Sequence, residues 1–163
     1  AKKYLSKEVL NLSVEMEPNI TVMIACRYNK KIPISSIKFN DKILSWASNE
    51  NSKERHKSKL NLWTIQTNIE WSKKVINKYK GRKSFFINKV INQFCKLTGF
   101  KKSEIVFQQV HGWKYSYNFK QTNFKSVWIN KYKLGLCADW FLGPKIENAW
   151  LSANDLYLKK FND

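Results

Sequence analysis

The pattern of apolar and polar residues along the chain separates predicted strands from predicted helices. Residues 20–28 form a continuous β-branched run, which is typical of a central strand covered on both faces. Residues 60–67 alternate with a period of two, which predicts a further strand. The same reasoning predicts strands at 105–117, 126–130 and 134–139.

Two segments between these strands carry turn and loop signals. In residues 36–48, two short apolar runs are separated by Asn40 and Asp41, which tolerate the positive φ of a tight turn. This segment therefore predicts a hairpin. Residues 49–59 contain no apolar side chain, so we expect a solvated loop between neighbouring strands.

Four stretches have the spacing of helices. Residues 4–14 suit a short helix that leads into the domain. Asn68 can cap a second helix, and Ser84 can cap a third that runs to Gly99. A final helix is predicted over Ile146–Lys160, whose apolar residues share one stripe.

The order of these elements predicts the fold class. Four strands, two helices, three strands and a last helix segregate helices from strands along the chain. This order favours an α+β fold, with a mixed, mostly antiparallel sheet and flanking helices. A chain of 163 residues, 43% of them apolar, is long enough for one core but too short for a second complete domain.

The formal net charge of +18 raises the question of a polyanionic partner. Only three of the thirty basic residues are Arg, the residue that nucleic-acid readers favour for bidentate contacts. Lys, Asn and Ile are abundant throughout, a bias that an AT-rich coding sequence produces without selection for a ligand. Both explanations stay open: compositional drift and a polyanion-binding surface.

The cysteine and histidine patterns indicate a cytoplasmic protein without a metal site. Cys26, Cys95 and Cys137 are far apart and flanked by apolar or aromatic residues, so we expect buried, reduced thiols. The two histidines are isolated from each other, which argues against structural zinc. No apolar run approaches the ~20 residues needed to cross a bilayer, so no membrane association is predicted.

The most informative segment is Leu134–Lys160, where a strand, a carboxylate, a glycine and a helix follow one another. A helix N-terminus in such a unit offers free N–H groups to electron-rich ligand atoms. Without a gap, this segment resembles the C-terminal flavin-contact motif of renalase-like FAD-dependent oxidoreductases, in the flavin-containing amine oxidase superfamily. The matching positions are Gly135, Asp139, Gly143, Glu147, Ala149 and Ser152. Ala138, Asn148 and Ala153 replace glycines of the family pattern.

Three upstream segments extend the resemblance over most of the chain. They are residues 43–54, 62–72 and 110–116, which are similar to the family's segments in order and spacing. The resemblance implies that Asp139 hydrogen-bonds the ribityl or pyrophosphate side of FAD. It also implies that Gly143 and the backbone at Lys145 and Ile146 lie at the cofactor, with the opening of the last helix facing the flavin pyrimidine edge.

The resemblance also implies a missing part. Dinucleotide binding needs a G-x-G-x-x-G turn between a strand and a helix, and no two of the five glycines here lie closer than eight residues. We therefore expect the N-terminal FAD-binding half to be absent from this chain. Residues 1–133 would form a substrate-binding domain, and residues 134–163 the returning strand-loop-helix of the FAD-binding domain. The chain alone should be inactive.

A flavoenzyme that transfers hydride needs no nucleophile, and we predict no catalytic side chain in this sense. It needs an apolar slot that stacks a planar substrate and polar groups that orient it. The candidates for the slot are Trp63, His111, Trp113 and Tyr115. Ordinary core or sheet packing is the alternative for each of the four.

Two functions are therefore weighed. By resemblance, the intact protein would pass hydride from a small planar reduced substrate, a dihydronicotinamide or an amine, to FAD and then to oxygen. The alternative is a basic module that binds single-stranded nucleic acid through Lys and aromatic residues such as Trp63, Trp113 and Tyr117. The scarcity of Arg makes nucleic acid the weaker expectation.

Overall fold

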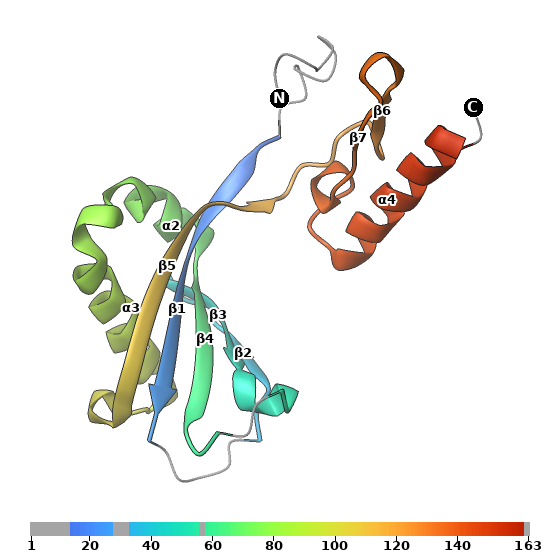
Figure 1. Cartoon of the computed structure of the whole chain (residues 1–163). Coiled ribbons are helices and arrows are strands. Elements are labelled where there is room, and N and C mark those ends of the chain that lie inside the picture. The colour runs from blue at the N-terminus through green and yellow to red at the C-terminus, as the bar shows by residue number, and fades with distance from the viewer. Residues whose placement is uncertain (1–13, 28–32, 56–57, 162–163) are drawn as a thin grey trace. The chain divides into compact units, whose positions relative to one another are not determined.

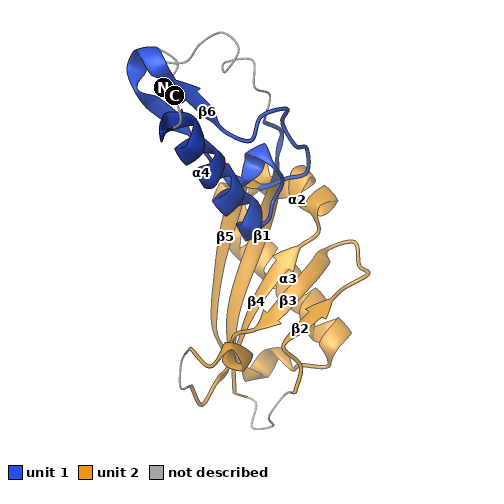
Figure 2. Ribbon diagram, turned by 90° about the vertical axis from the view of Figure 1, so that its right-hand side faces the viewer, with its two compact units in different colours: residues 1–17, 117–163 blue, residues 18–116 orange. Residues whose placement is uncertain are grey.

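The structure, a computed structural model, describes residues 14–27, 33–55 and 58–161. It has an α+β fold, as predicted, with a five-stranded antiparallel sheet, a second small sheet and three helices (Figure 1). The chain divides into two compact units, which are described separately (Figure 2). Unit 2 comprises residues 18–116, and unit 1 comprises residues 1–17 and 117–163.

The large sheet has the strand order β2-β3-β4-β1-β5. Its strands are β1 Met16–Cys26, β2 Ser36–Lys38, β3 Leu44–Asn49, β4 Asn61–Thr67 and β5 Ile105–Asn118. β1 and β3 each pair antiparallel with β4. The predicted strands at 20–28, 60–67 and 105–117 correspond to β1, β4 and β5, and the predicted hairpin corresponds to β2 and β3.

The hairpin turn differs from the tight two-residue turn that the sequence suggested. Five residues, 39–43, separate β2 from β3. The Asp41 carboxylate accepts hydrogen bonds from the backbone N–H groups of Ile43 and Leu44 at 2.8 and 2.9 Å. Asp41 thus caps a wider turn, because its side chain replaces the backbone bonds that a two-residue turn would make.

Helices α2 Ile69–Val75 and α3 Lys83–Thr98 belong to unit 2 and cover one face of the sheet (Figure 1). The predicted cap at Asn68 is confirmed, since its side chain accepts from the Glu70 N–H at 2.9 Å. The predicted cap at Ser84 is wrong. The 3-10 turn Lys80–Arg82 runs directly into α3, so the helix begins one residue before Ser84. At its other end Gly99 adopts φ +79°, as a helix-ending glycine should.

The core of unit 2 lies between α3 and the sheet. Alternate residues of β1 and β4 point toward the helix, because successive side chains on a strand face opposite sides. The buried apolar side chains of this cluster are Ile20, Val22, Ile24, Cys26, Leu44, Ala47, Trp63, Ile65, Tyr79, Phe86, Val90, Ile91 and Phe94.

Unit 1 contains the small sheet and the last helix. β6 Val127–Ile129 pairs antiparallel with β7 Leu134–Leu136, and α4 spans Ile146–Phe161. The predicted strand at 134–139 ends early, at Leu136, because Asp139–Phe141 form a 3-10 turn. The predicted helix at 146–160 is confirmed as α4. The predicted helix at 4–14 lies outside the described residues, apart from Val14.

The boundaries of the two compact units differ from the domain boundary that the resemblance implies. The resemblance places a boundary at residue 133, whereas the described units separate near residues 17 and 117. The assignment of residues 134–163 to a FAD-binding domain stays a prediction.

Candidate functional site

The sheet face opposite α3 carries a row of exposed aromatic side chains along β5. His111 and Trp113 lie in contact, with ring centroids 4.2 Å apart, and Trp113 and Tyr115 are 49% and 68% exposed. The Trp113 indole N–H donates to the Thr21 hydroxyl on β1 at 3.2 Å. Because β5 runs unbroken through Gly112, residues spaced by two share this face. The structure therefore brings three of the four predicted slot residues together.

Gly112 explains how β5 packs closely at this point. A Cβ atom added to Gly112 would lie 2.7 Å from the ring of Tyr79 and 3.1 Å from the side chain of Ile76, both in the segment between α2 and α3. The Tyr79 hydroxyl donates to the Val110 carbonyl at 2.9 Å, which holds the ring against the back of the strand. The absence of a Cβ atom at Gly112 thus allows the close approach of this ring.

Trp63 does not lie on the His111–Tyr115 face. It is 1% exposed and packs on the helix-covered side of the sheet, where its ring contacts those of Phe94 and Phe100. Its indole N–H has no hydrogen-bond acceptor among the described residues. Trp63 also borders a cavity of about 370 Å³. The structure places this residue in the core, so the packing alternative holds for it.

The sequence reasoning missed one residue of the open face. Thr21 on β1 supplies the hydroxyl that accepts from the Trp113 indole N–H. Nothing in the run around Thr21 distinguishes it in the sequence. Two further aromatic side chains of β5, Phe107 in unit 2 and Tyr117 in unit 1, are exposed.

In unit 1, the loop between β7 and α4 holds Asp139 and Gly143. Gly143 has φ +112°, a conformation that side-chain-bearing residues rarely adopt, and its N–H donates to the Asp139 carbonyl at 2.8 Å. The Asp139 carboxylate is partly exposed, and no donor among the described residues binds it. Because Asp139 is only partly buried, its carboxylate avoids most of the desolvation cost of a buried, unpaired charge.

The N-terminus of α4 is open. Lys145 precedes the helix, its carbonyl accepts from the Asn148 and Ala149 N–H groups, and Ile146 is 92% exposed. The Asn148 side chain donates to the carbonyls of Leu142 and Gly143, each at 3.0 Å. Asn148, which replaces a family glycine, therefore ties the loop to the helix. In the described structure, no acceptor takes the N–H groups of Ile146 and Glu147.

Buried polar contacts fix α4 to the rest of unit 1. The Ser152 hydroxyl donates to the Lys125 carbonyl at 2.6 Å and accepts from the Ala138 N–H at 3.0 Å. One turn later, Asp155 accepts from the Ser126 hydroxyl at 2.6 Å and pairs with Lys159 at 2.8 Å. Burial raises the pKa of Asp155, but these two donors outweigh it, and the net pKa lies below the ordinary value.

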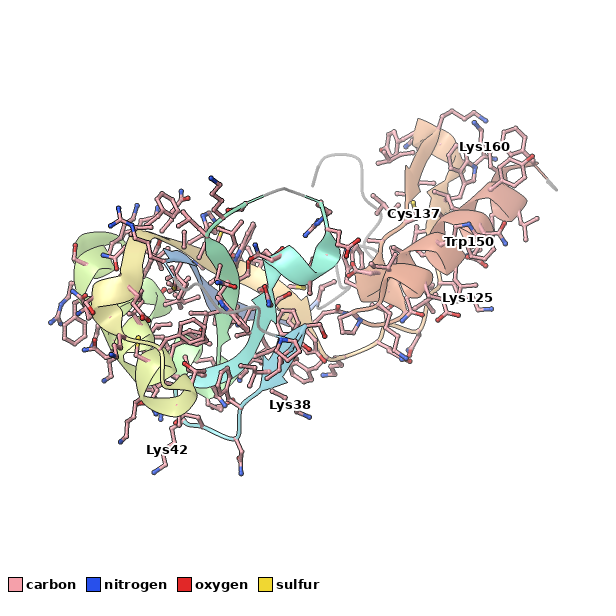
Figure 3. The ribbon with its side chains drawn as sticks, turned by 90° about the horizontal axis from the view of Figure 1, so that it is seen from below. Lys38, Lys42, Lys125, Cys137, Trp150 and Lys160 are labelled. Atoms are coloured by element: carbon pink, nitrogen blue, oxygen red, sulfur yellow. The ribbon has the colours of Figure 1, made fainter. Side chains whose placement is uncertain are left out.

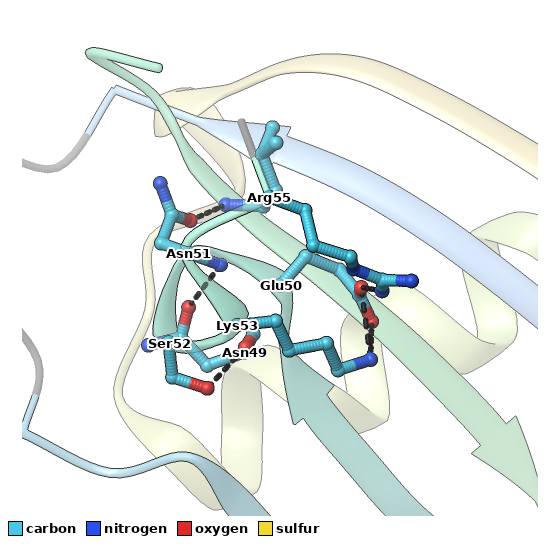
Figure 4. A network of polar contacts seen from close by, with 7 residues as sticks. Asn49, Glu50, Asn51, Ser52, Lys53 and Arg55 are labelled. Carbon is cyan, nitrogen blue, oxygen red and sulfur yellow. Dashed lines mark hydrogen bonds and ion pairs between the residues drawn. The ribbon is translucent and has the colours of Figure 1, made fainter. Parts of the chain in front are cut away.

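A second polar network closes the loop between β3 and β4, where the sequence predicted a solvated loop (Figure 4). Residues Glu50–Lys53 form a 3-10 turn, and the Glu50 carboxylate pairs with Lys53 at 2.8 Å and Arg55 at 2.9 Å. Asn51 donates to the Leu60 carbonyl and accepts from the Leu62 N–H. Lys53 and Arg55 are thereby paired with a carboxylate inside the loop.

The prediction of three buried thiols is wrong for one of them. Cys26 is buried, and burial raises its pKa to about 11. Cys95 is partly buried, while Cys137 is exposed, because the chain leaves β7 one residue earlier and turns its next side chain outward. All three are free cysteines.

Comparison with known protein families finds no family model that matches the chain. Within the described ranges, no group of three His, Cys, Asp or Glu side chains could hold a metal ion. No helix in that part of the chain is both long and apolar enough to cross a bilayer.

Proposed function

We propose that this chain is the substrate-binding part and flavin-contact tail of a renalase-like FAD-dependent oxidoreductase. In the intact protein it would help to transfer hydride from a small planar reduced substrate, a dihydronicotinamide or an amine, to FAD, with oxygen as the final acceptor. The FAD-binding half would be supplied by polypeptide outside this chain.

One observation carries the proposal. The segment with the gapless family resemblance folds into a strand, a loop with a positive-φ glycine and a helix whose first N–H groups are open. The chemistry of these groups fits a flavin, because unpartnered N–H donors suit its electron-rich pyrimidine edge and the Asp139 carboxylate suits a ribityl hydroxyl. FAD, when bound, would supply the two-electron acceptor.

The open face of the sheet supports the substrate role. Trp113 and Tyr115 present exposed aromatic surfaces against which a flat ring can stack, and such stacking is worth about 0.5 to 1.5 kcal/mol beyond burial. His111, in contact with Trp113, offers a ring nitrogen that can orient a carboxamide by hydrogen bonding. Hydride transfer requires only this positioning, so no side chain of the chain needs to act as a nucleophile.

The test uses the complete gene product and flavin reduction by a dihydronicotinamide under anaerobic conditions. Trp113→Ala should slow flavin reduction by about tenfold or more, because a lost stacking surface misplaces the substrate, while FAD content stays unchanged. Phe107→Ala is the matched control, since Phe107 is a similarly exposed aromatic residue near the other end of β5. Equal rates in both variants would contradict the role of Trp113.

The same face favours a second candidate, a module for single-stranded nucleic acid. Exposed Trp113 and Tyr115 offer rings on which bases can stack, and the Lys114 ammonium lies 5.6 Å from the centre of the Tyr115 ring, whereas Trp63 is buried and unavailable. A salt titration with fluorescently labelled oligonucleotides separates the two functions. Micromolar binding that weakens steeply with salt and is lost in Trp113→Ala would favour the module.

A further inference from the structure

Unit 2 contains a cavity of about 370 Å³, which we call the Trp63 cavity. Its lining comes from β2 and the segment leading into it, from β4, and from the C-terminal end of α3 as far as Phe100. All of these lining residues belong to unit 2. The cavity is therefore complete within one compact unit, and it lies on the helix-covered side of the sheet, away from the face of His111, Trp113 and Tyr115.

The Trp63 cavity has a rim and a floor. Ile34 and Leu97 are 47% and 46% exposed, so they form a rim that is open to solvent. Trp63 is the one fully buried residue among the described lining residues, so it forms the floor. Phe100 is partly buried, and its ring meets the Trp63 ring edge-on with centroids 5.8 Å apart. A small molecule can thus enter from solvent and contact Trp63.

Among the described residues, one side-chain donor of the lining has no partner. The Trp63 indole N–H finds no acceptor there. The Thr98 hydroxyl, in contrast, already donates to the Phe94 carbonyl at 2.7 Å. A buried N–H group without an acceptor is costly, and each such group in a native structure calls for an explanation. An oxygen atom of a bound molecule would remove this cost.

The charges around the Trp63 cavity favour a neutral occupant. None of the described lining residues is charged. Lys38, which follows Ile37 on β2, is exposed and points outward (Figure 3). The C-terminal end of α3, which carries a partial negative charge, lies at the cavity and disfavours an anion. A cation would leave the indole N–H without an acceptor.

The volume of the Trp63 cavity sets the size of the occupant. A cavity of about 150 Å³ accommodates benzene. A cavity of about 370 Å³ therefore suits a molecule of roughly two fused rings, at the small end of ligand pockets. Water alone is a poor occupant, because a buried water molecule needs about two to four polar partners and this lining is largely apolar.

We propose that the Trp63 cavity binds a neutral, largely apolar molecule of about two rings, whose carbonyl or ether oxygen accepts a hydrogen bond from the Trp63 indole N–H. The rings of Trp63 and Phe100 would pack against its apolar part. This site is separate from the proposed substrate face and requires no FAD, so it stands or falls independently of the flavoenzyme proposal.

The test uses the 163-residue chain and two probes of similar shape. The ketone α-tetralone carries an acceptor oxygen, and the hydrocarbon tetralin does not. Nuclear magnetic resonance of isotope-labelled protein follows the indole N–H signals, and Trp63→Phe identifies the signal of Trp63. Saturating α-tetralone should move this signal downfield, as hydrogen bonding does, and tetralin should not. The preference for α-tetralone over tetralin should fall at least about fivefold in Trp63→Phe, because the oxygen loses its donor.

A pair of leucine substitutions tests the location of the probe. Leu97→Ala removes apolar contacts at the rim, so it should weaken the binding of both probes by at least about threefold. Leu158→Ala is the matched control, since Leu158 is also 46% exposed and lies on a helix of unit 1. It should leave the affinities unchanged.

Each other outcome overturns the proposal. Absence of binding by both probes up to their solubility limits would mean that the cavity is no site for this class of molecule. A Trp63 signal that stays in place at saturation, or an unchanged preference in Trp63→Phe, would exclude the indole N–H as the donor. Equal affinities in Leu97→Ala and Leu158→Ala would place the probes elsewhere. If Trp63→Phe fails to fold, the wild-type signals and the leucine pair still decide.

Discussion

Unit 2 and unit 1 differ in what they bury. Unit 2 packs apolar residues from three strands and α3 into a continuous cluster that includes Trp63, Phe94 and Ile91. Among its described residues, unit 1 buries one aromatic ring, Phe141, and its helix is held mainly through hydroxyl and carboxylate contacts of Ser152, Ser126 and Asp155. Apolar burial makes unit 2 the better-packed of the two units, whereas helix α4 of unit 1 is held by polar contacts and leaves large apolar side chains exposed.

The difference has a consequence for where function can reside. The predicted substrate residues stand on the scaffold, where strand pairing fixes their spacing. The predicted flavin-contact residues stand in the unit with little core of its own. Substitutions in the core of unit 2, in the Asp139 loop and on the open face of β5 should therefore affect stability, cofactor retention and substrate oxidation independently.

The largest effect should come from the core of unit 2. Phe94→Ala removes a fully buried ring that contacts Trp63, Phe39 and Phe100, so it should lower the free energy of unfolding by about 3 to 5 kcal/mol. Phe85→Ala, on the same helix but half exposed, should cost about 1 kcal/mol or less. Urea denaturation followed by circular dichroism measures both, and similar losses would break the contrast between core and surface.

The next effect concerns the loop of unit 1. In the complete gene product, Asp139→Ala should weaken FAD binding by about 1.5 to 3 kcal/mol, the worth of a hydrogen bond to a charged group. The 163-residue chain should hold no flavin with or without the substitution. Flavin absorbance after dialysis measures retention, and undiminished retention in Asp139→Ala would remove this residue from the cofactor site.

A smaller effect should follow from filling the space behind β5. Gly112→Ala brings a Cβ atom against the Tyr79 ring, which its hydroxyl bond to Val110 restrains, so we expect a loss of about 1 to 3 kcal/mol. Gly81→Ala is the control, since nothing lies within 4 Å of the added atom. Thermal unfolding of both variants tests whether the close approach matters, and equal midpoints would show that it does not.

The smallest effect is a pH dependence in unit 1. The pKa of Asp155 is lowered on folding, so its stabilising contribution is complete above the unfolded value of 3.8 and disappears as the pH falls through the lower folded value. Hydrogen exchange in α4 should therefore accelerate in this acidic range by an amount equivalent to about 1 kcal/mol. Asp155→Asn should exchange faster already at neutral pH and lose this dependence; an unchanged pH profile would exclude Asp155 as its source.

The sequence predicted the presence of strands and helices that have a clear hydrophobic period or a capping residue. It predicted less well at which residues these elements begin and end. The β-branched run of β1, the alternation of β4 and the Asn68 cap were sufficient, because local preference and tertiary packing agree there. The start of α3 was missed because a 3-10 turn, which leaves no distinctive residue pattern, carries the chain into the helix before Ser84.

The candidate site was predictable only in part. The spacing of His111, Trp113 and Tyr115 gave their common face, since a strand fixes alternate side chains to one side. Trp63 could not be placed, because alternation defines two faces of β4 without telling which one a helix covers. The exposure of Cys137 depended on where β7 ends, which the apolar run up to Ala138 did not reveal.

The buried indole of Trp63 has an optical consequence. Its N–H finds no acceptor among the described residues and its ring lies among Phe94 and Phe100, so its excited state should relax little and emit at the blue end of the tryptophan range. Trp113 and Trp150 are exposed and should emit nearer the red end. The emission of the chain is therefore a composite, in which the blue component reports on the core of unit 2 and part of the red component on the exposed side of α4.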